Sequence, residues 1–393
     1  LGNSLDIGTP SDNTVTAAKI ASDAVTTAKI ADSNITSAKL ASGVIQNQSA
    51  FKNIIINGDM SIHQRGSDGT TNNSFGVDRF KYNDSNNFDQ RGFTVGQVTD
   101  VPSGQGFSNS QKFTVTTTET TIDADEYSRI SQFIEAQNLQ YLKFGTSSAE
   151  SLTLSFWVKS SVTGTYAVTL YEDDDARIIG STYTISSANT WEKKTITFSG
   201  DTTGVIDNNG GIGLVVNWYL SAGSNFTSSD NTSWSSSSNA KLAYGHSASI
   251  LSTASATWQI TGVQLEAGTS ASDFEFLPHD VNRERCLRYF QSPGRGSTYY
   301  HNIVFNGYNS TICYGSIELE KSMRVVPSCS ITTTSRNLYN NGAAKTISSV
   351  NISNASKEHV AMDIGGSGWS SGNALHFNSN DSTNGLLTAD AEL

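Results

Sequence analysis

Stretches in which apolar and polar residues alternate run through most of the chain and predict β-strands. In the clearest of them, residues 152–159, the alternation places Leu152, Leu154, Phe156 and Val158 on one face. Similar stretches predict strands over residues 54–62, 165–171, 191–198, 213–219 and 257–265. Clusters of Asn, Asp, Ser and Gly separate these stretches, so we expect an antiparallel β-sandwich over residues 51–280.

The pattern changes to a helical one near residue 281. A helix is predicted over residues 281–291, with Asp280 as its N-cap and with Cys286, Leu287 and Phe290 on one face. Strand patterns then return over residues 299–305, 311–319, 326–334, 346–352 and 359–364. We therefore expect a linker helix followed by a β-rich C-terminal tip over residues 281–393.

Residues 1–50 carry a ten-residue repeat in which a large apolar residue returns every five positions. These residues include Val15, Ile20, Val25, Ile30, Ile35 and Leu40. A period of five matches neither a helix nor a strand, and so short a segment cannot bury a core of its own. We expect a stalk in which three chains pack around an axis lined by these side chains, which makes the protein a homotrimer. A disordered low-complexity linker is the alternative.

The composition supports an all-β fold and excludes several classes of protein. Only 16% of the residues are charged, against about 25% in an ordinary domain, and Ser, Thr, Asn and Gly take their place. No apolar run approaches the roughly 20 residues that cross a bilayer, so we expect no membrane insertion. The three cysteines have no CxxC spacing, which indicates a reduced protein assembled in the cytoplasm. Because residue 1 is Leu and no signal peptide precedes the repeat, we expect that an upstream segment is missing.

The net charge of −11 excludes a globally basic nucleic-acid-binding protein. Residues 1–50 contribute −1, residues 51–280 contribute −11, and residues 281–393 contribute +1. Self-repulsion on this scale favours cation binding or a salty habitat for the middle region. The acidic run Asp173, Asp174 and Asp175 is a candidate for a structural calcium ion, which prefers oxygen ligands. The tip of a hairpin is the competing interpretation of that run.

Four segments resemble a domain of bacteriophage tail-fibre proteins when they are taken together in this order. Residues 53–66 read NIIINGDMSIHQRG, and residues 77–80 read VDRF. Residues 258–268 read WQITGVQLEAG, and residues 282–291 read NRERCLRYFQ. The resemblance therefore extends over most of the chain.

The resemblance implies a jelly-roll middle domain that is similar to a carbohydrate-binding module. It also implies a location on the virion, with other phage tail or capsid proteins bound to the N-terminal end of the chain. The receptor would be a polysaccharide or lipopolysaccharide of the host cell surface. At Phe80 this chain departs from the family, which usually has Trp there, so an aromatic role is kept without an indole hydrogen bond.

No motif for catalysis stands out. The sequence has no Gly-rich phosphate loop, no HExxH and no GxSxG, and its six histidines are scattered. We therefore expect attachment to a host glycan by multivalent, non-catalytic binding. One alternative is a tailspike enzyme that cleaves polysaccharide with a pair of carboxyl groups. Another is a purely structural capsid fibre or tail connector.

Aromatic side chains among small polar residues are the candidates for glycan binding, because flat rings stack on sugars. The candidates are Tyr299, Tyr300, Tyr308, Trp369, Trp218 and Trp234. We expect recognition in residues 281–393, which are nearly neutral and place Trp369 in a Gly-Ser run typical of an exposed loop. In the alternative, the indole folds onto its own sheet and the site lies in the jelly roll, at Trp218 or Trp234.

Overall fold

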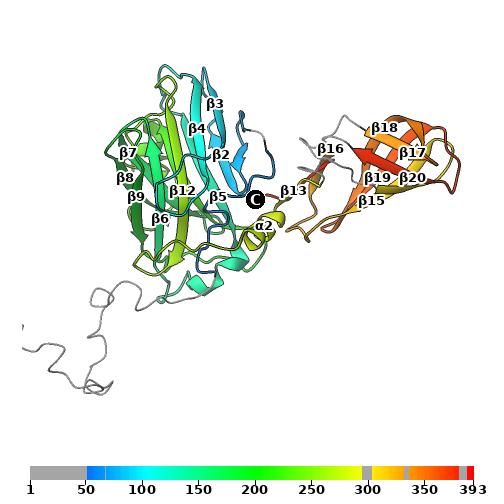
Figure 1. Cartoon of the computed structure of the whole chain (residues 1–393). Coiled ribbons are helices and arrows are strands. Elements are labelled where there is room, and N and C mark those ends of the chain that lie inside the picture. The colour runs from blue at the N-terminus through cyan, green and yellow to red at the C-terminus, as the bar shows by residue number, and fades with distance from the viewer. Residues whose placement is uncertain (1–50, 67, 294–302, 332–335, 380–386) are drawn as a thin grey trace, which may run out of the picture. The chain divides into compact units, whose positions relative to one another are not determined.

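A computed structural model describes residues 51–66, 68–293, 303–331, 336–379 and 387–393, and Figure 1 shows it. The stalk residues predicted to line a trimer axis lie outside these ranges, as do Tyr299 and Tyr300. Residues 51–393 belong to one compact unit. The described residues form almost only β-structure, as the alternating pattern predicted. None of the helices in these ranges is long and apolar enough to cross a membrane.

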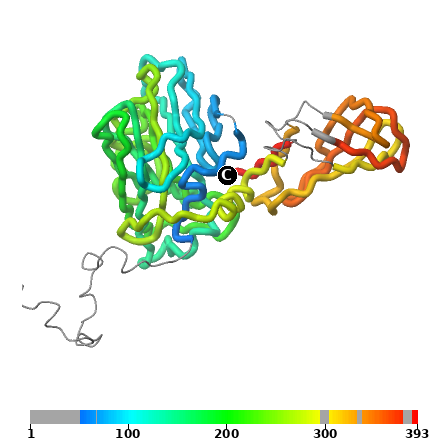
Figure 2. The backbone as a smooth tube through the Cα atoms, in the orientation of Figure 1, coloured from blue at the N-terminus to red at the C-terminus, as the bar shows by residue number. Residues whose placement is uncertain are grey.

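The first part is a sandwich of two antiparallel sheets, whose strands gather in one body in Figure 2. The seven-stranded sheet has the order β1 (Phe75–Val77), β2 (Phe80–Asp84), β5 (Tyr127–Glu135), β10 (Ile212–Ala222), β7 (Gly164–Glu172), β8 (Arg177–Ile185) and β11 (Ser235–Ser236). The five-stranded sheet has the order β3 (Gly92–Val98), β4 (Ser110–Thr117), β12 (Thr257–Ala267), β6 (Leu152–Ser160) and β9 (Glu192–Phe198). The chain passes repeatedly from one sheet to the other, as in a jelly roll.

The core between the sheets is filled by the apolar faces that the alternation predicted. Leu154, Phe156 and Val158 of β6 are fully buried. Trp218 of β10 stands edge-on to the Phe156 ring, with 6.0 Å between the ring centroids. Its indole also lies 6.2 Å from the ring of Phe80, so the aromatic residue at that position packs in the core.

The strand predicted over residues 54–62 is wrong, although its apolar side chains are buried. Asn57 and Met60 have φ angles of 62° and 59°, which belong to the left-handed region and not to a strand. The Asn57 side chain takes over the bonding of the bend, since its Oδ1 accepts from the Ile62 N–H at 2.9 Å. Gln132 of β5 pairs with both the N–H and the carbonyl of Ile56, at 2.8 and 3.0 Å. In this segment, side-chain amides therefore make the hydrogen bonds to the backbone that a neighbouring strand would otherwise make.

The predicted helix is present but begins earlier and ends sooner than expected. Helix α2 spans His279–Leu287, so Asp280 lies in its first turn, and Pro278 occupies the N-cap position without a side-chain bond. The N-cap role predicted for Asp280 is wrong. The other helices within the described ranges are the short α1 (Ser224–Thr227) and the 3₁₀ turns η4 (Ala136–Asn138), η5 (Gln140–Leu142) and η6 (Asn239–Lys241).

The last third forms a closed antiparallel barrel and a small sheet. The barrel has the order β14 (Ile303–Gly307), β15 (Ile312–Glu318), β19 (His359–Ser367), β18 (Ala343–Ala355), β17 (Arg336–Asn340) and β20 (Ala374–Ser379). The small sheet has the order β13 (Phe290–Gln291), β21 (Leu387–Asp390) and β16 (Ser328–Ile331). The strands predicted over residues 311–319, 346–352 and 359–364 are confirmed.

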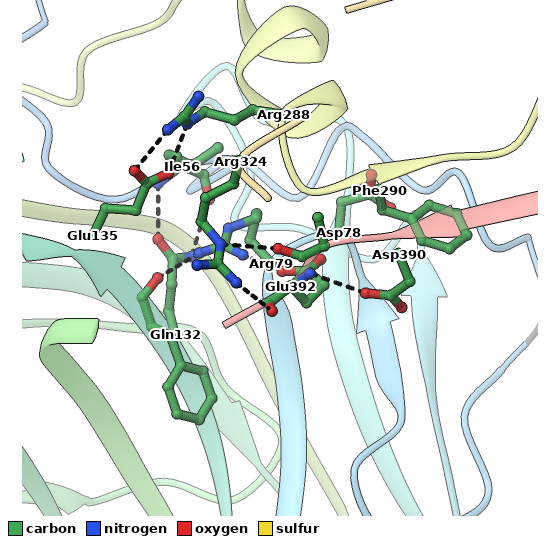
Figure 3. A network of polar contacts seen from close by, with 12 residues as sticks. Ile56, Asp78, Arg79, Gln132, Glu135, Arg288, Phe290, Arg324, Asp390 and Glu392 are labelled. Atoms are coloured by element: carbon green, nitrogen blue, oxygen red, sulfur yellow. Dashed lines mark hydrogen bonds and ion pairs between the residues drawn. The ribbon is translucent and has the colours of Figure 1, made fainter. Parts of the chain in front are cut away.

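The residues after β21 join the sandwich through a network of charged groups, which Figure 3 shows. The Glu392 carboxylate forms an ion pair with the buried guanidinium of Arg79. Arg324 donates to the carbonyls of Ala391 and Glu392, both at 3.0 Å. Arg65 lies 3.3 Å from the Asp390 carboxylate.

Candidate functional site

The outer face of the seven-stranded sheet, which points away from the core, carries an unusual set of side chains. Because side chains alternate along a strand, Val215, Asn217 and Tyr219 of β10 lie on this face, while Trp218 points into the core. The register of β10 with β5 places Ser131 opposite Asn217. Cross-strand neighbours on one face of a sheet are close enough to act together.

A polar row crosses four strands of this face. Register pairs Lys81 of β2 with Ser131 of β5, Ser131 with Asn217 of β10, and Asn217 with Thr169 of β7. The Ser131 hydroxyl donates to Asn217 Oδ1 at 2.7 Å. The Asn217 amide donates to Thr169 Oγ1 at 3.4 Å. These bonds hold the amide of Asn217 in one orientation on the floor of the face.

Aromatic and apolar side chains flank the polar row on one side. Register places Phe133 of β5 opposite Val215 of β10, and Val215 opposite Tyr171 of β7. Phe133 and Tyr171 are half-buried, so part of each ring remains accessible. Burial raises the pKa of the Tyr171 phenol, and the nearby carboxylates of Asp173 and Glu172 add to this effect. The phenol therefore stays neutral at physiological pH.

Arg129 of β5 lies on the other side of the polar row. Its register partner on β10 is Tyr219, and its Nη1 donates to the Tyr219 hydroxyl at 3.1 Å. The guanidinium carbon also lies 5.1 Å from the ring centroid of Tyr127, which suits a cation–π contact. Tyr219 is fully buried, so it holds Arg129 in place from below.

These rows form the floor and walls of a groove with a volume of about 320 Å³. Its lining consists of Tyr127, Arg129, Phe133, Tyr171, Asp173, Val215, Asn217, Ser237 and Leu242. The last two residues belong to the segment between β10 and β12, which folds over the sheet. Phe226 and Ala243 of that segment pack on Tyr219 and Ala167, so the segment closes one end of the face.

A second hollow of about 670 Å³ lies beside helix α2, and it is the weaker candidate for a binding site. Its rim includes Phe51 and Tyr141, together with Arg285. Two of its charged groups are already paired with each other, because Arg288 donates to both oxygens of Glu135 at 2.7 and 2.9 Å, and Arg285 donates to the Asn53 carbonyl at 3.3 Å. Figure 3 shows this pair at the edge of the charged network.

The two tryptophans predicted in the sandwich serve packing. Trp218 has no exposed surface, so its ring cannot reach a sugar. Trp234 is half-buried and stands edge-on to Phe144, with ring centroids 5.6 Å apart. Its indole N–H donates to the Ser199 carbonyl at 2.6 Å. Apolar contacts on one side and a backbone partner on the other fix this indole as a structural element.

The prediction that Trp369 lies in an exposed loop is wrong. The side chain is 5% exposed and belongs to the barrel core. Two glycines make room for it. A Cβ atom on Gly366 would lie 2.7 Å from the indole, and one on Gly307 would lie 3.2 Å from it. The Gly-Ser run therefore lets the ring fold back onto its own sheet.

Tyr308 is the one tip candidate in the described ranges whose ring is open to solvent, with 64% of its surface exposed. The ring of Tyr314 lies 5.5 Å away and is 45% exposed. Together they form an aromatic pair on the outside of the barrel.

The acidic run lies in the turn between β7 and β8, as the hairpin interpretation predicted. Asp174 and Asp175 accept hydrogen bonds from the backbone N–H groups of Asp207 and Val205, at 2.9 and 2.8 Å. Their carboxylates thus tie one loop to another. Across the described ranges, no group of three or more His, Cys, Asp or Glu side chains could hold a metal ion. Asp173 points elsewhere and lines the groove.

The residues of the groove were not predicted from the sequence. Tyr127, Arg129 and Phe133 alternate with buried residues along β5, and this stretch was not recognised as a strand. Asn217 lay in a predicted strand, where a polar residue between Val216 and Trp218 was the signal that could have been used. Its meaning depends on the register with β5 and β7, which the sequence does not contain.

The chain matches no protein-family model and no curated protein sequence. Among solved structures, it is similar to the enzymatically active domain of tailspike protein 4 of bacteriophage CBA120, with 16% identity and a TM-score of 0.31. That likeness covers 55% of this chain and 21% of the tailspike chain, so this chain spans about a fifth of it. It is also similar to the carbohydrate-binding module TmCBM61 in complex with β-1,4-galactotriose, with 12% identity, a TM-score of 0.27, and coverage of 55% and 98%. A third likeness is to the family 11 carbohydrate-binding module of the cellulase Lic26A-Cel5E of Clostridium thermocellum, with 14% identity, a TM-score of 0.26, and coverage of 52% and 97%.

Proposed function

We propose that the sandwich binds carbohydrate in the groove on the outer face of the seven-stranded sheet. The observation that carries this proposal is that the half-buried side chains of Tyr127, Arg129, Phe133 and Tyr171 line one groove, whose floor is held by the buried polar row. Sugar rings present apolar faces that stack on aromatic rings and hydroxyl edges that need fixed hydrogen-bonding partners. The groove volume of about 320 Å³ lies at the lower end of the range for small-ligand sites.

We propose that this binding is not coupled to hydrolysis. A glycosidase needs two carboxyl groups about 5 Å or about 6.5–9.5 Å apart on either side of the scissile bond. Among the described residues that line the groove, Asp173 carries the only carboxyl group. A single carboxylate can accept hydroxyl protons in hydrogen bonds, but it cannot act as both acid and base.

We further propose that the protein is a fibre of a phage virion and displays three such grooves on a trimeric stalk. Support comes from the resemblance of residues 53–66, 77–80, 258–268 and 282–291 to tail-fibre proteins and from the repeat in residues 1–50. Three weak sites on one axis bind a repetitive surface polysaccharide far more tightly than one site does. This arrangement allows modest affinity in each groove.

Binding of the full chain to an array of bacterial surface polysaccharides tests the proposal. Tyr171→Ala and Phe133→Ala should each weaken binding by about two- to tenfold, because each change removes a stacking surface. Tyr308→Ala on the barrel is the matched control and should leave binding unchanged. Loss of binding in Tyr308→Ala with intact binding in both groove variants would move the site to the tip. Release of reducing ends that Asp173→Asn abolishes would show that the groove is an enzyme site.

A further inference from the structure

We infer that the groove selects an anionic glycan, one whose sugar carries a carboxylate that Arg129 binds. This inference rests on the proposed function and names the class of ligand for the same groove. Three observations carry it: the unpaired charge of Arg129, the position of Lys81 beside it, and the separation of both cations from Asp173.

The charge of Arg129 is not neutralised by the protein. No carboxylate lies within ion-pair distance of its guanidinium among the residues that the structure describes. By contrast, Arg79, Arg91, Arg177 and Arg288 of the same unit each have a carboxylate partner. Of its five N–H donors, Arg129 uses one for the Tyr219 hydroxyl, and its buried Nε has no partner in the described chain. The planar guanidinium has the geometry that matches a carboxylate with two parallel hydrogen bonds.

Lys81 adds a second cation on the same face. It lies opposite Ser131, which is two residues from Arg129 along β5. Its ammonium group lies 5.4 Å from the ring of Phe133, which lines the groove. Burial lowers the pKa of Lys81, and the charge of Arg129 acts in the same direction, while the carboxylates of Glu392 and Asp390 oppose it. Arg129 is the cation that lines the groove, and Lys81 adds positive charge on the same face.

The one acidic side chain of the groove lies at the opposite side of the polar row. Asp173 follows the end of β7, and its N–H bonds to the carbonyl of Gly213 at the start of β10. Arg129 lies near the other end of β10, opposite Tyr219. The groove therefore has a cationic side and an anionic side, which orients a sugar with its carboxylate at Arg129 and its hydroxyls toward Asp173 and Asn217.

The net charge of residues 51–280 does not contradict this assignment. That region carries −11, but charges in water are screened beyond about 8 Å at physiological ionic strength. A ligand in the groove responds mainly to the groups that line it. The structure places two cations, Lys81 and Arg129, on the face that carries the groove.

The test measures binding of the full chain to a panel of acidic capsular polysaccharides, each used intact and after chemical reduction of its uronic acids to neutral sugars. At least one intact polysaccharide should bind, and its reduced form should bind about tenfold or more weakly, since a charge-assisted pair is lost. Arg129→Gln should weaken binding of the intact form by a similar factor. Arg129→Lys should keep part of it, because the charge remains without the planar geometry.

Two controls separate recognition from folding. Arg283→Gln removes an exposed arginine that pairs with Glu320, and it should leave binding unchanged. Tyr219→Phe keeps the guanidinium but removes its hydrogen bond, so a loss of binding smaller than that of Arg129→Gln, at equal melting temperature, is expected. Equal binding of intact and reduced polysaccharides overturns the inference and leaves the proposed function standing. Binding to no member of the panel, intact or reduced, overturns the proposed function together with the inference.

Discussion

Arg79 shows how much one buried charge depends on one distant partner. Its side chain is almost fully buried, its guanidinium donates to the Phe133 carbonyl, and it stacks 3.5 Å from the ring centroid of Tyr289. Its negative partner is Glu392, which is itself largely buried. Removing one member of such a pair leaves an uncompensated charge away from water.

We therefore predict that Glu392→Gln lowers the free energy of unfolding by about 3–5 kcal/mol. Denaturant unfolding of the full chain, followed by fluorescence, measures the change. Glu320→Gln breaks the exposed pair with Arg283 and should cost about 1 kcal/mol or less. Similar small losses in both variants would mean that Arg79 finds water or another partner.

We predict that His246 makes the folded protein less stable as the pH falls. The side chain is buried, and burial lowers its pKa from 6.5 to about 4. Its Nδ1 accepts the N–H of Ala167 at 3.1 Å, a bond that protonation of this nitrogen would break. Between pH 6.5 and 4 the unfolded chain takes up a proton here and the folded chain does not, so acidification favours unfolding.

His246→Gln should remove this dependence, which amounts to about 1.4 kcal/mol per pH unit in that window. Glu172 and Asp78 have raised pKa values of about 7 and about 6 and act in the opposite sense, so the slope of the wild type alone is not informative. The measurement is the difference in unfolding free energy between variant and wild type at several pH values. His359→Gln, which replaces an exposed histidine by the same residue, is the control for the substitution itself. A constant difference for His246→Gln would contradict the prediction.

At the scale of single elements, the core of the barrel contains the indole of Trp369, which comes from the loop after β19. Trp369 follows β19 and lies against the backbone of Gly307 in β14 and Gly366 in β19. A Cβ on Gly366 would also lie 1.9 Å from the Thr346 carbonyl oxygen of β18. The two glycines allow one indole to lie against both β14 and β19, so the ring contributes to the packing of the barrel.

Trp369→Ala should destabilise the barrel by about 3–5 kcal/mol, because it leaves a cavity in a small core. Tyr308→Ala, at a largely exposed ring of the same barrel, should have little effect on stability. Calorimetry of both variants, with assignment of the transitions by hydrogen exchange, measures the difference. A barrel transition of Trp369→Ala that is unchanged from the wild type would place the ring outside the core in solution.

The elements also show which patterns could be interpreted from the sequence alone. Strand β6 was predicted correctly because its apolar and polar residues alternate regularly, and one face of the strand is buried in the core. Residues 54–62 show the same alternation, but two left-handed residues and side-chain amides turn them into a bend. Alternation therefore indicates which side chains are buried. It does not indicate whether the backbone N–H and C=O groups bond to another strand or to side chains.

The candidate site was harder to predict than the fold, for a physical reason. Trp218 and Trp369 stood out among polar neighbours, yet both pack in cores. Stacking surfaces arose from residues on separate strands, such as Phe133 and Tyr171, which meet only through the register of β5, β10 and β7. Register depends on hydrogen bonds between distant segments, so local patterns contain little information about it.

At the scale of the whole molecule, the repeat in residues 1–50 predicts assembly. Sedimentation or mass photometry of the full chain should give about three times 42.0 kDa. Replacing Ile20, Ile30 and Leu40 together by Asp should yield monomers, since three unpaired charges would be buried near the axis. Replacing Lys19, Lys29 and Lys39 by Gln is the matched control and should leave the assembly intact. A folded wild-type monomer at micromolar concentration would refute the stalk.

The pairing of Arg79 with Glu392 also affects when the sandwich can finish folding during synthesis. Arg79 is translated 313 residues before its partner. At about 5–20 residues per second, Arg79 is made about 15–60 s before Glu392 can neutralise it, and the last sandwich strand, β12, is made about 6–25 s before. A nascent chain that stalls within the barrel thus carries a full set of sandwich strands around an open charged position. Such a chain should remain bound to chaperones until translation resumes, so completion of the sandwich waits for a residue that is made after the barrel.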